Sequence, residues 1–146
     1  LRYPFADGGD VDKLMLNMLK RQQSRDAVFY VPDSCVWFYV WCIALALKEC
    51  FEGKIMHNDI KLPNVLYDND KNVFMLTDFG LSCHSTDKQV PFTCSFFAGT
   101  PDYIAPEVFS NYKRSWYTDI WSFGITIWEI AIGRRKSPTK HLSFFC

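Results

Sequence analysis

The sequence predicts a mainly α fold with one small β-hairpin. Three segments carry apolar residues at helical spacing, at about residues 11–19, 33–52 and 117–132. One pair of short β-like runs, at residues 65–67 and 73–76, lies between the second and third segments. A single hairpin cannot enclose a core. We therefore expect the helices to form the core and the hairpin to lie at an edge.

The first two helices have recognisable ends. Gly8-Gly9 predicts a turn, and Asp10 is the expected N-cap of the first helix. The sequence Pro32-Asp33-Ser34 is expected to begin the second helix, which runs to about Glu52. Gly53 follows at the position where glycine commonly ends a helix.

The remaining elements follow from turn residues and composition. The sequence DNDKN joins the two runs of the hairpin, and residues 81–98 have no period and predict a long loop. A short helix is expected from Ala105 to about Tyr112, with Pro106 in its first turn. The segment 117–132 is apolar nearly all round, which predicts a buried central helix ended by Gly133.

Composition favours a folded domain with a neutral surface. Of the 146 residues 49% are apolar, so a real core can form. Lys+Arg and Asp+Glu both number 16, and this zero net charge gives no indication of a nucleic-acid or anionic-membrane partner. The longest apolar run, Cys35 to Leu47, is shorter than the roughly 20 residues of a membrane span. We therefore expect a buried helix there and no membrane partner.

Six cysteines occur without a CxxC pair, so the usual zinc spacing is missing. They are Cys35, Cys42, Cys50, Cys83, Cys94 and Cys146. An even number is compatible with disulfides in a secreted protein, but the first residues, LRYPFADGGD, do not resemble a signal peptide. We expect reduced, buried cysteines in a cytoplasmic protein, with the nucleus as the alternative. The start at Leu1, without a methionine, also suggests a piece of a longer chain.

The stretch His57-Asn58-Asp59-Ile60-Lys61-Leu62-Pro63-Asn64 contains polar side chains suited to phosphate chemistry. On an extended loop, Asp59 and Lys61 point the same way because they are two residues apart. An aspartate can accept a proton or orient a hydroxyl, and a lysine can neutralise a phosphoryl group. Asn64 offers a carbonyl oxygen to a hard cation such as Mg²⁺. Taken alone, the stretch is also compatible with a solvated polar loop, although the site is the favoured interpretation.

Four further short motifs follow this stretch in order. They are Asp78-Phe79-Gly80, directly after a β-like run, then Gly99-Thr100-Pro101, Ala105-Pro106-Glu107 and the segment 119–124, DIWSFG. Each motif alone is a weak signal, whereas the ordered set is not expected by chance.

This ordered set resembles the C-terminal lobe of eukaryotic protein kinases. HNDIKLPN is similar to the catalytic loop, DFG to the magnesium-binding motif and APE to the end of the activation segment. Lys61 and the sequence GTPDY are typical of serine/threonine kinases, and YPFADGGDVDKLM with ALALKEC is similar to NIMA-related kinases. The resemblance extends from about Tyr3 to about Gly133. It implies a partial kinase domain over residues 1–146, with an irregular tail at about 134–146.

The resemblance also implies a role for each site residue. Asp59 would orient the substrate hydroxyl and accept its proton, and Lys61 would contact the transferred phosphoryl group. Asn64 and Asp78 would hold Mg²⁺, and Leu66 would pack beneath the adenine of ATP. Thr100 would brace Asp59 and Lys61 through its hydroxyl.

Four more residues would have structural roles in such a kinase. His57 and Phe79 would stack in the core. Asp119 would hold the backbone of the catalytic loop from the central helix, and Glu107 would anchor the activation segment.

The chain departs from the kinase pattern at two positions. Asn58 replaces an arginine that in the family pairs with an activation-loop phosphate, so control through Thr93 or Ser95 should be weaker. Those two residues are equally readable as ordinary loop hydroxyls. Leu62-Pro63 replaces the usual order, with the proline one place later than expected, and Pro63 should restrict Leu62 to an extended geometry.

The larger departure is the lack of N-terminal-lobe motifs. The 146 residues contain no glycine-rich phosphate loop and no VAIK-like lysine. Two functions therefore stay open. The first is a serine/threonine kinase that transfers phosphate from ATP to protein Ser or Thr and is present as a fragment of low activity. The alternative is a non-catalytic kinase-like interaction module. An unrelated helical scaffold would require all the motifs to be coincidental.

Overall fold

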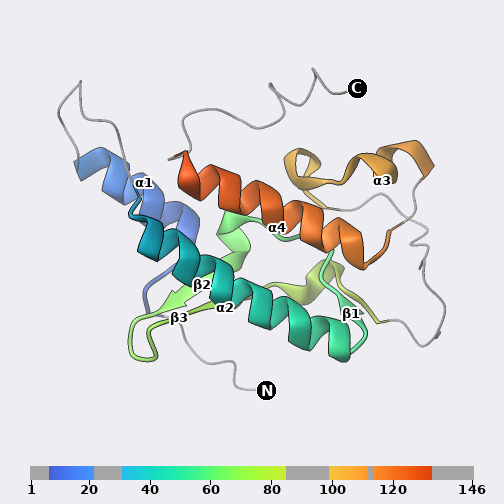
Figure 1. Ribbon diagram of the computed structural model, residues 1–146, viewed down its shortest axis with the longest axis horizontal. Helices are drawn as coiled ribbons and strands as arrows, with labels where there is room; N and C mark the ends of the chain where they lie inside the picture. Colours follow the sequence, from blue (N-terminus) through green and yellow to red (C-terminus); the bar gives the residue numbers. More distant parts are fainter. Residues whose placement is uncertain (1–6, 22–30, 85–98, 112–113, 133–146) are drawn as a thin grey trace.

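The computed structural model describes residues 7–21, 31–84, 99–111 and 114–132 (Figure 1). Over these residues the fold is mainly α, with short antiparallel strand pairs. The expectations for residues 1–6, 22–30, 85–98, 112–113 and 133–146 lie outside the described residues. These include Thr93, Ser95, the end of the central helix at Gly133 and the irregular tail.

The first helix, α1 (Val11–Arg21), begins at the predicted N-cap. Asp10 Oδ1 accepts the backbone N–H of Lys13 at 2.8 Å, which satisfies one of the free donors of the first turn. The preceding Gly8-Gly9 pairs with the hairpin, because Gly8 N–H donates to the Tyr67 carbonyl at 3.0 Å. A side chain at Gly8 would lie 2.5 Å from that same carbonyl oxygen, so only glycine fits there.

The two long helices, α2 (Asp33–Glu52) and α4 (Trp116–Ala131), pack side by side and run antiparallel (Figure 1). Near one end Tyr39 donates a buried hydrogen bond to Thr126 at 2.9 Å, and near the other Phe51 meets Trp116 edge to face. The predicted ends of α2 are confirmed, since Gly53 N–H closes the helix on the Glu49 carbonyl.

The predicted hairpin is confirmed as β2 (Val65–Asp68) and β3 (Val73–Leu76), paired antiparallel with Val65 opposite Leu76. Its Phe74 ring packs against Phe38 and Tyr39 of α2. A second strand pair, β1 (Ile55–Met56) with β4 (Cys83–His84), was not predicted. The prediction of a loop from residue 81 is therefore wrong at Cys83 and His84.

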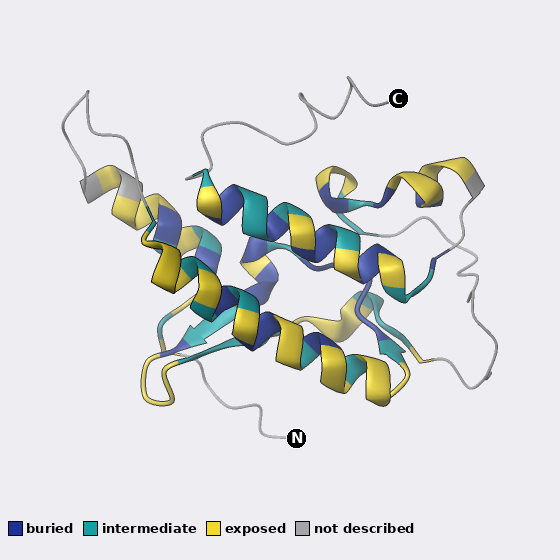
Figure 2. Cartoon of the chain, in the orientation of Figure 1, coloured by how far each residue is buried: buried dark blue, intermediate teal, exposed yellow. Residues whose placement is uncertain are grey.

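The short helix α3 (Pro106–Asn111) has Pro106 in its first turn as predicted, and it begins one residue after the expected start at Ala105. The expectation that the central helix is buried all round is wrong. One face of α4 is buried through Phe123 and Ile130, whereas Tyr117 and Ile120 are 74% and 55% exposed. Figure 2 shows the same division on both long helices, with buried faces turned inward and exposed faces outward. A helix packed on one side only leaves its opposite apolar face in solvent.

A single cluster of buried residues joins these elements. It draws side chains from α1, α2, the catalytic-loop region, β2 and α4: Val11, Met15, Tyr39, Ile43, Leu47, Ile60, Leu62, Val65, Phe123 and Ile130. Because Ile60 and Leu62 are fully buried in it, the loop between β1 and β2 is fixed to the core.

Helix α2 is also, by length and composition alone, long and apolar enough to cross a membrane. The uninterrupted apolar run from Cys35 to Leu47 is shorter than a membrane span, whereas this criterion applies to the whole helix, Asp33–Glu52. The core helix of a soluble protein meets the same criterion, and α2 packs on α4 and β3. Its outer face exposes Trp37 and Trp41, so the expectation of a buried helix holds for one face only.

Four of the cysteines, Cys35, Cys42, Cys50 and Cys83, lie in the part of the chain that the structure describes. Only Cys42 is buried as expected, whereas Cys35 is exposed and Cys50 and Cys83 are half-buried. The expectation of buried cysteines was therefore wrong for three of them, because their helix or strand faces are not covered.

Candidate active site

The stretch 57–64 forms a loop between β1 and β2 and ends in a 3-10 turn, η1 (Leu62–Asn64). The carboxylate of Asp119 on α4 accepts the backbone N–H of His57 at 2.7 Å and that of Asn58 at 2.8 Å. The contact expected of Asp119 is therefore present. Since Asp119 lies in the first turn of a long core helix, the start of the loop is tied to a rigid element.

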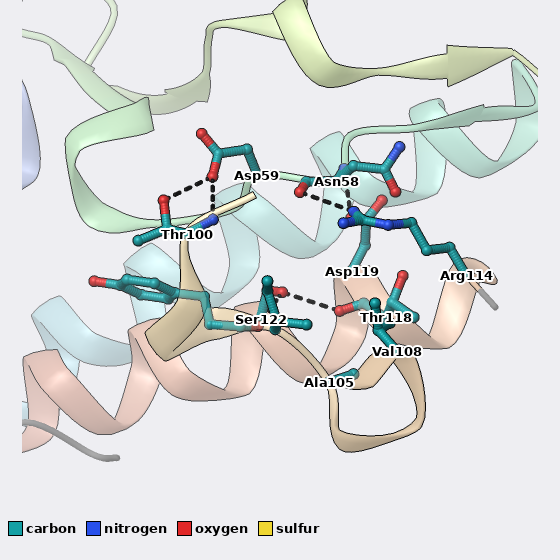
Figure 3. A pocket seen from close by; sticks show the side chains of 11 residues that line it. Asn58, Asp59, Thr100, Ala105, Val108, Arg114, Thr118, Asp119 and Ser122 are labelled. Atoms are coloured by element: carbon teal, nitrogen blue, oxygen red, sulfur yellow. Dashed lines mark hydrogen bonds between the residues drawn. The ribbon is translucent and has the colours of Figure 1, made fainter. Parts of the chain in front are cut away.

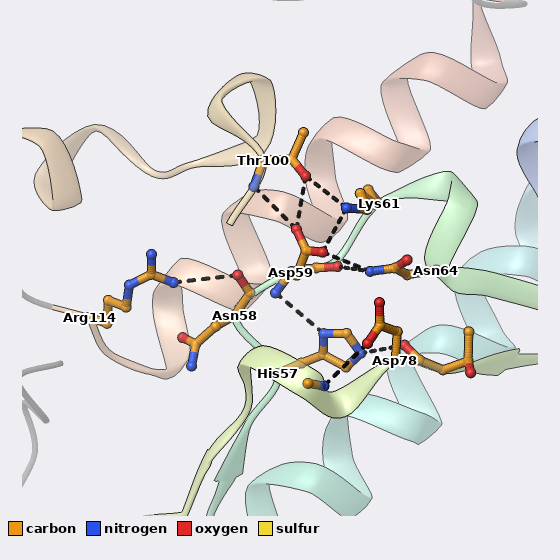
Figure 4. Close-up of polar contacts among 10 residues, drawn as sticks. His57, Asn58, Asp59, Lys61, Asn64, Asp78, Thr100 and Arg114 are labelled. Atoms are coloured by element: carbon orange, nitrogen blue, oxygen red, sulfur yellow. Dashed lines mark hydrogen bonds and ion pairs between the residues drawn. The ribbon is translucent and has the colours of Figure 1, made fainter. Parts of the chain in front are cut away.

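The carboxylate of Asp59 lies at the centre of the polar contacts in Figure 4. Its Oδ1 accepts hydrogen bonds from the backbone N–H and the hydroxyl of Thr100, at 3.1 and 2.9 Å. Its Oδ2 accepts Asn64 Nδ2 at 2.9 Å and pairs with Lys61 Nζ at 2.7 Å. Lys61, Asn64 and Thr100 thus converge on the carboxylate of Asp59.

Thr100 also connects Asp59 with Lys61. Its hydroxyl donates to Asp59 and accepts from Lys61 Nζ at 2.9 Å, which closes a triangle of three polar groups. The hydroxyl contacts expected of Thr100 are present. Thr100 is the N-cap residue of η3 (Pro101–Tyr103), but its hydroxyl makes no capping bond there and contacts Asp59 and Lys61 instead.

These contacts set the protonation of Asp59. Burial raises the pKa of its carboxyl, but hydrogen bonds from Lys61, Thr100 and Asn64 outweigh burial and hold the pKa below its ordinary value. Asp59 is therefore a carboxylate at neutral pH. A carboxylate can accept a hydrogen bond from an incoming hydroxyl and take its proton during reaction.

Asn64 is oriented so that its carbonyl oxygen can serve as a ligand. Its Nδ2 donates to the backbone oxygen of Asp59 at 2.8 Å and to Asp59 Oδ2, so the amide nitrogen is already used within the loop. The expected extension of Leu62 by Pro63 is wrong. Lys61 is extended instead, and Leu62 lies in η1 because Asn64 N–H closes on the Lys61 carbonyl at 2.9 Å.

Asp78 follows β3 in the left-handed conformation, with φ of 62°. Its Oδ1 accepts the N–H of Gly80 at 3.3 Å, and the side chain is exposed. In Figure 4 the Asp78 carboxylate points towards the side of the loop that carries Asn64. Asp78 is exposed and Asn64 is buried, and their two oxygen ligands, with the remaining positions filled by phosphate and water, match the usual protein site for Mg²⁺. Asn64 and Asp78 could therefore hold this cation.

The two motifs are joined by the backbone and by an aromatic contact. Thr77 N–H donates to the Asn64 carbonyl at 3.0 Å, and His57 Nε2 contacts the Thr77 carbonyl at 2.9 Å. The rings of His57 and Phe79 lie 4.7 Å apart, so the expected ring contact is present, but Phe79 is 43% exposed and the expectation that it lies in the core is wrong. The fully buried His57 therefore fixes the Asp78 turn to the loop of Asp59.

The comparison with known families agrees with this geometry. The family described as "Protein kinase domain" matches residues 5–143. The chain belongs to the protein kinase family.

The curated relatives of this kinase chain include proteins named as serine/threonine-protein kinases. It is 30% identical over 128 residues to the serine/threonine-protein kinase nekl-2 of Caenorhabditis elegans. It is 35% identical over 127 residues to the serine/threonine-protein kinase Nek5 of Mus musculus, and 35% identical over 130 residues to the atypical protein kinase C of Drosophila melanogaster. The matches cover 86%, 86% and 89% of this chain. They span 34%, 18% and 19% of those relatives.

Two predicted residues of the kinase chain stand apart from the carboxylate cluster. Leu66 is half-buried on β2, where its backbone bridges to Asp10. Glu107 is exposed on α3. It lines a hollow on α4 together with Tyr117, Ile120 and Trp121.

Sequence reasoning missed Arg114 and Gly99. Arg114 is buried and donates from Nη1 to the Asn58 carbonyl at 3.4 Å. Gly99 has φ of 103°, and a side chain there would meet the same carbonyl at 2.9 Å. A buried arginine outside every recognised motif is a signal only once the fold shows what it faces. The glycine was seen as part of GTP, but its contact was not.

Proposed function

We propose that the protein containing this chain transfers the γ-phosphate of ATP to serine or threonine hydroxyls of protein substrates. The single observation that carries the proposal is the convergence of Lys61, Asn64 and Thr100 on the Asp59 carboxylate. In this function the 146 residues supply the C-terminal lobe, and the lobe that covers ATP lies elsewhere in the full-length protein.

Each residue of the cluster then has one task. Asp59 accepts the hydrogen bond of the substrate hydroxyl and takes up its proton. Lys61, which pairs with Asp59 in this structure, moves to the phosphoryl group when ATP is present. Thr100 holds both side chains at the distances that transfer requires, since positioning is the main contribution of a kinase to the reaction.

Asn64 Oδ1 and the Asp78 carboxylate would bind Mg²⁺ on the open side of the loop. The cation neutralises charge on the phosphates when bound. Leu66 would face the adenine from β2. With the other wall of the nucleotide site absent, the isolated 146 residues are expected to turn over slowly, because they cannot exclude water from the γ-phosphate. We place the protein in the cytoplasm, with the nucleus as the alternative, and we propose no nucleic-acid or membrane partner.

A non-catalytic kinase-like module remains the alternative, and one observation favours it. Asn58 brings no positive charge to the position before Asp59, where the family has arginine. The alternative predicts that the full-length protein binds partners without transferring phosphate.

Phosphate transfer by the full-length protein separates the two functions. The measurement is incorporation of label from γ-labelled ATP into a mixture of protein substrates. Asp59→Asn should reduce the initial rate by at least about 10³-fold, because the base is lost while the fold remains. Asp70→Asn, in the exposed turn of the hairpin, is the matched control and should leave the rate unchanged. A folded full-length protein that transfers no phosphate, or an Asp59→Asn variant as active as the parent, would contradict the proposal.

A further inference from the structure

Arg114 is a buried cation next to the catalytic loop. It is 4% exposed and lies just before Ser115, the N-cap of α4. Figures 3 and 4 show its side chain directed at Asn58. Its Nη1 donates to the Asn58 carbonyl at 3.4 Å, which is long for a hydrogen bond. The contact is therefore partly a charge–dipole interaction.

The carbonyl that Arg114 contacts belongs to the peptide preceding Asp59. The N–H of the same peptide donates to His57 Nδ1 at 3.3 Å. Asn58 itself is left-handed, with φ of 65°, a conformation that costs energy for a residue other than glycine. A strained peptide requires contacts on both sides to keep its orientation, and Arg114 supplies the contact on the carbonyl side.

The carboxylates near Arg114 also favour a positive charge at this position. A cavity of about 10 Å³ lies beside it and has room for roughly one water molecule. Among the described residues that line this cavity there are two carboxylates, Asp59 and Asp119, and one cation, Arg114. Burial raises the pKa of Asp119, whereas Arg114 is among the groups that lower it. A buried carboxylate is costly, and the charge of Arg114 adds to the two backbone N–H donors of His57 and Asn58 in stabilising Asp119, the anchor of the loop.

Asn58 cannot provide that charge. Its Nδ2 donates to the Leu81 carbonyl at 3.0 Å, and its buried Oδ1 has no hydrogen-bond donor among the described residues. In most kinases an arginine at this place would bring a positive charge. Here the positive charge comes from a residue 56 positions later in the chain.

We propose that Arg114 is a positioning residue for Asp59, acting through the Asn58 carbonyl and through Asp119. This role rests on the kinase function proposed above. Arg114 does not touch the reacting groups. It fixes the peptide that carries Asp59, so its loss should lower the rate of transfer without weakening ATP binding.

Three variants of the full-length protein test this role. Arg114→Met removes the charge and the hydrogen bond at similar length, and Arg114→Lys keeps the charge. Val108→Ala is the matched control, because Val108 is 2% exposed, lines the same cavity and belongs to α3. Its truncation should destabilise the fold without releasing the Asn58 carbonyl.

Two measurements are made on each variant. Steady-state kinetics should show kcat about 10- to 100-fold lower for Arg114→Met with KM for ATP within about twofold, and recovery of most of kcat by Arg114→Lys. Hydrogen exchange followed by mass spectrometry should show that the peptide covering residues 57–59 exchanges at least about tenfold faster in Arg114→Met than in Val108→Ala.

The exchange result stands even when no phosphate is transferred. If the parent protein is inactive, the proposed function fails. Faster exchange in Arg114→Met would still support the proposal that Arg114 fixes the peptide between Asn58 and Asp59. Equal exchange of residues 57–59 in Arg114→Met and Val108→Ala would overturn the proposal. An unchanged kcat in Arg114→Met, or a rise in KM alone, would overturn it as well.

Discussion

At the scale of single residues, the site depends on the hydrogen bonds that the Asp59 carboxylate accepts. Asp59 accepts hydrogen bonds from the backbone and hydroxyl of Thr100 and from Asn64, and it pairs with Lys61. Three of these four interactions come from side chains, so each can be removed separately. The hydroxyl of Thr100 is the informative one, because it touches both the proposed base and the proposed phosphate-binding cation.

We predict that Thr100→Val in the full-length protein lowers kcat by about 10- to 100-fold, because Asp59 and Lys61 lose their common partner. Stability should fall by only about 1 kcal/mol, since the backbone N–H of Thr100 still donates to Asp59. Thr100→Ser keeps the hydroxyl and is the control. Equal kcat values for Thr100→Val and the parent, measured in the same transfer assay, would show that the hydroxyl does not position these groups.

The residues of this cluster could be predicted because their spacing is characteristic of a known family. Asp59, Lys61 and Asn64 lie within six residues of one another, and Thr100 belongs to a recognisable motif. Arg114 could not be predicted. Its contact with Asn58 spans 56 positions, and no motif contains it. Only the packing of the start of α4 against the loop brings the two together.

At the scale of elements, helix caps were the most predictable features. Asp10 was expected to begin α1, and its carboxylate both caps the helix and pairs with Lys13 at 2.9 Å. Burial raises the pKa of Asp10, but the contacts with Lys13 outweigh this and lower the pKa below its ordinary value of 3.8. The stabilisation from Asp10 is therefore present above pH 3.8 and is lost as the pH falls through the lowered pKa.

We predict that Asp10→Ala destabilises the kinase domain by about 1 kcal/mol at neutral pH, the usual cost of losing an N-cap. Asp10→Asn should cost less, because asparagine caps as well as aspartate does. The difference between the parent and Asp10→Asn should disappear as the pH is lowered through the pKa of Asp10. Urea unfolding over that pH range is the measurement. A difference that persists in acid would mean that the charge of Asp10 contributes nothing.

Short strands and helix exposure were the least predictable features at this scale. The strands β1 and β4 have two residues each and pair across a large separation in sequence, so neither carries an alternating pattern. The apolar composition of α4 suggested burial all round, yet Tyr117 and Ile120 are exposed. Composition reveals that a helix is apolar, but only its neighbours determine which face is covered.

At the scale of the whole molecule, two antiparallel helices form a base to which the loop of residues 57–64 is fixed. Asp119 of α4 holds the loop through His57 and Asn58, and Ile60 and Leu62 fix it to the core. The mainly α fold and the order of its parts followed from periodicity and turn residues.

The central claim is that residues 57–64 and Asp78 form one site for ATP with Mg²⁺. Calorimetric titration of the full-length protein with ATP, with and without Mg²⁺, tests this claim most directly. We predict that Mg²⁺ strengthens ATP binding and that Asp78→Ala abolishes this effect. The thermal unfolding midpoint of Asp78→Ala should stay close to that of the parent. Asp70→Ala, an exposed change, should retain the effect. ATP binding that is equal with and without Mg²⁺ in the parent, or a Mg²⁺ effect that survives in Asp78→Ala, would contradict it.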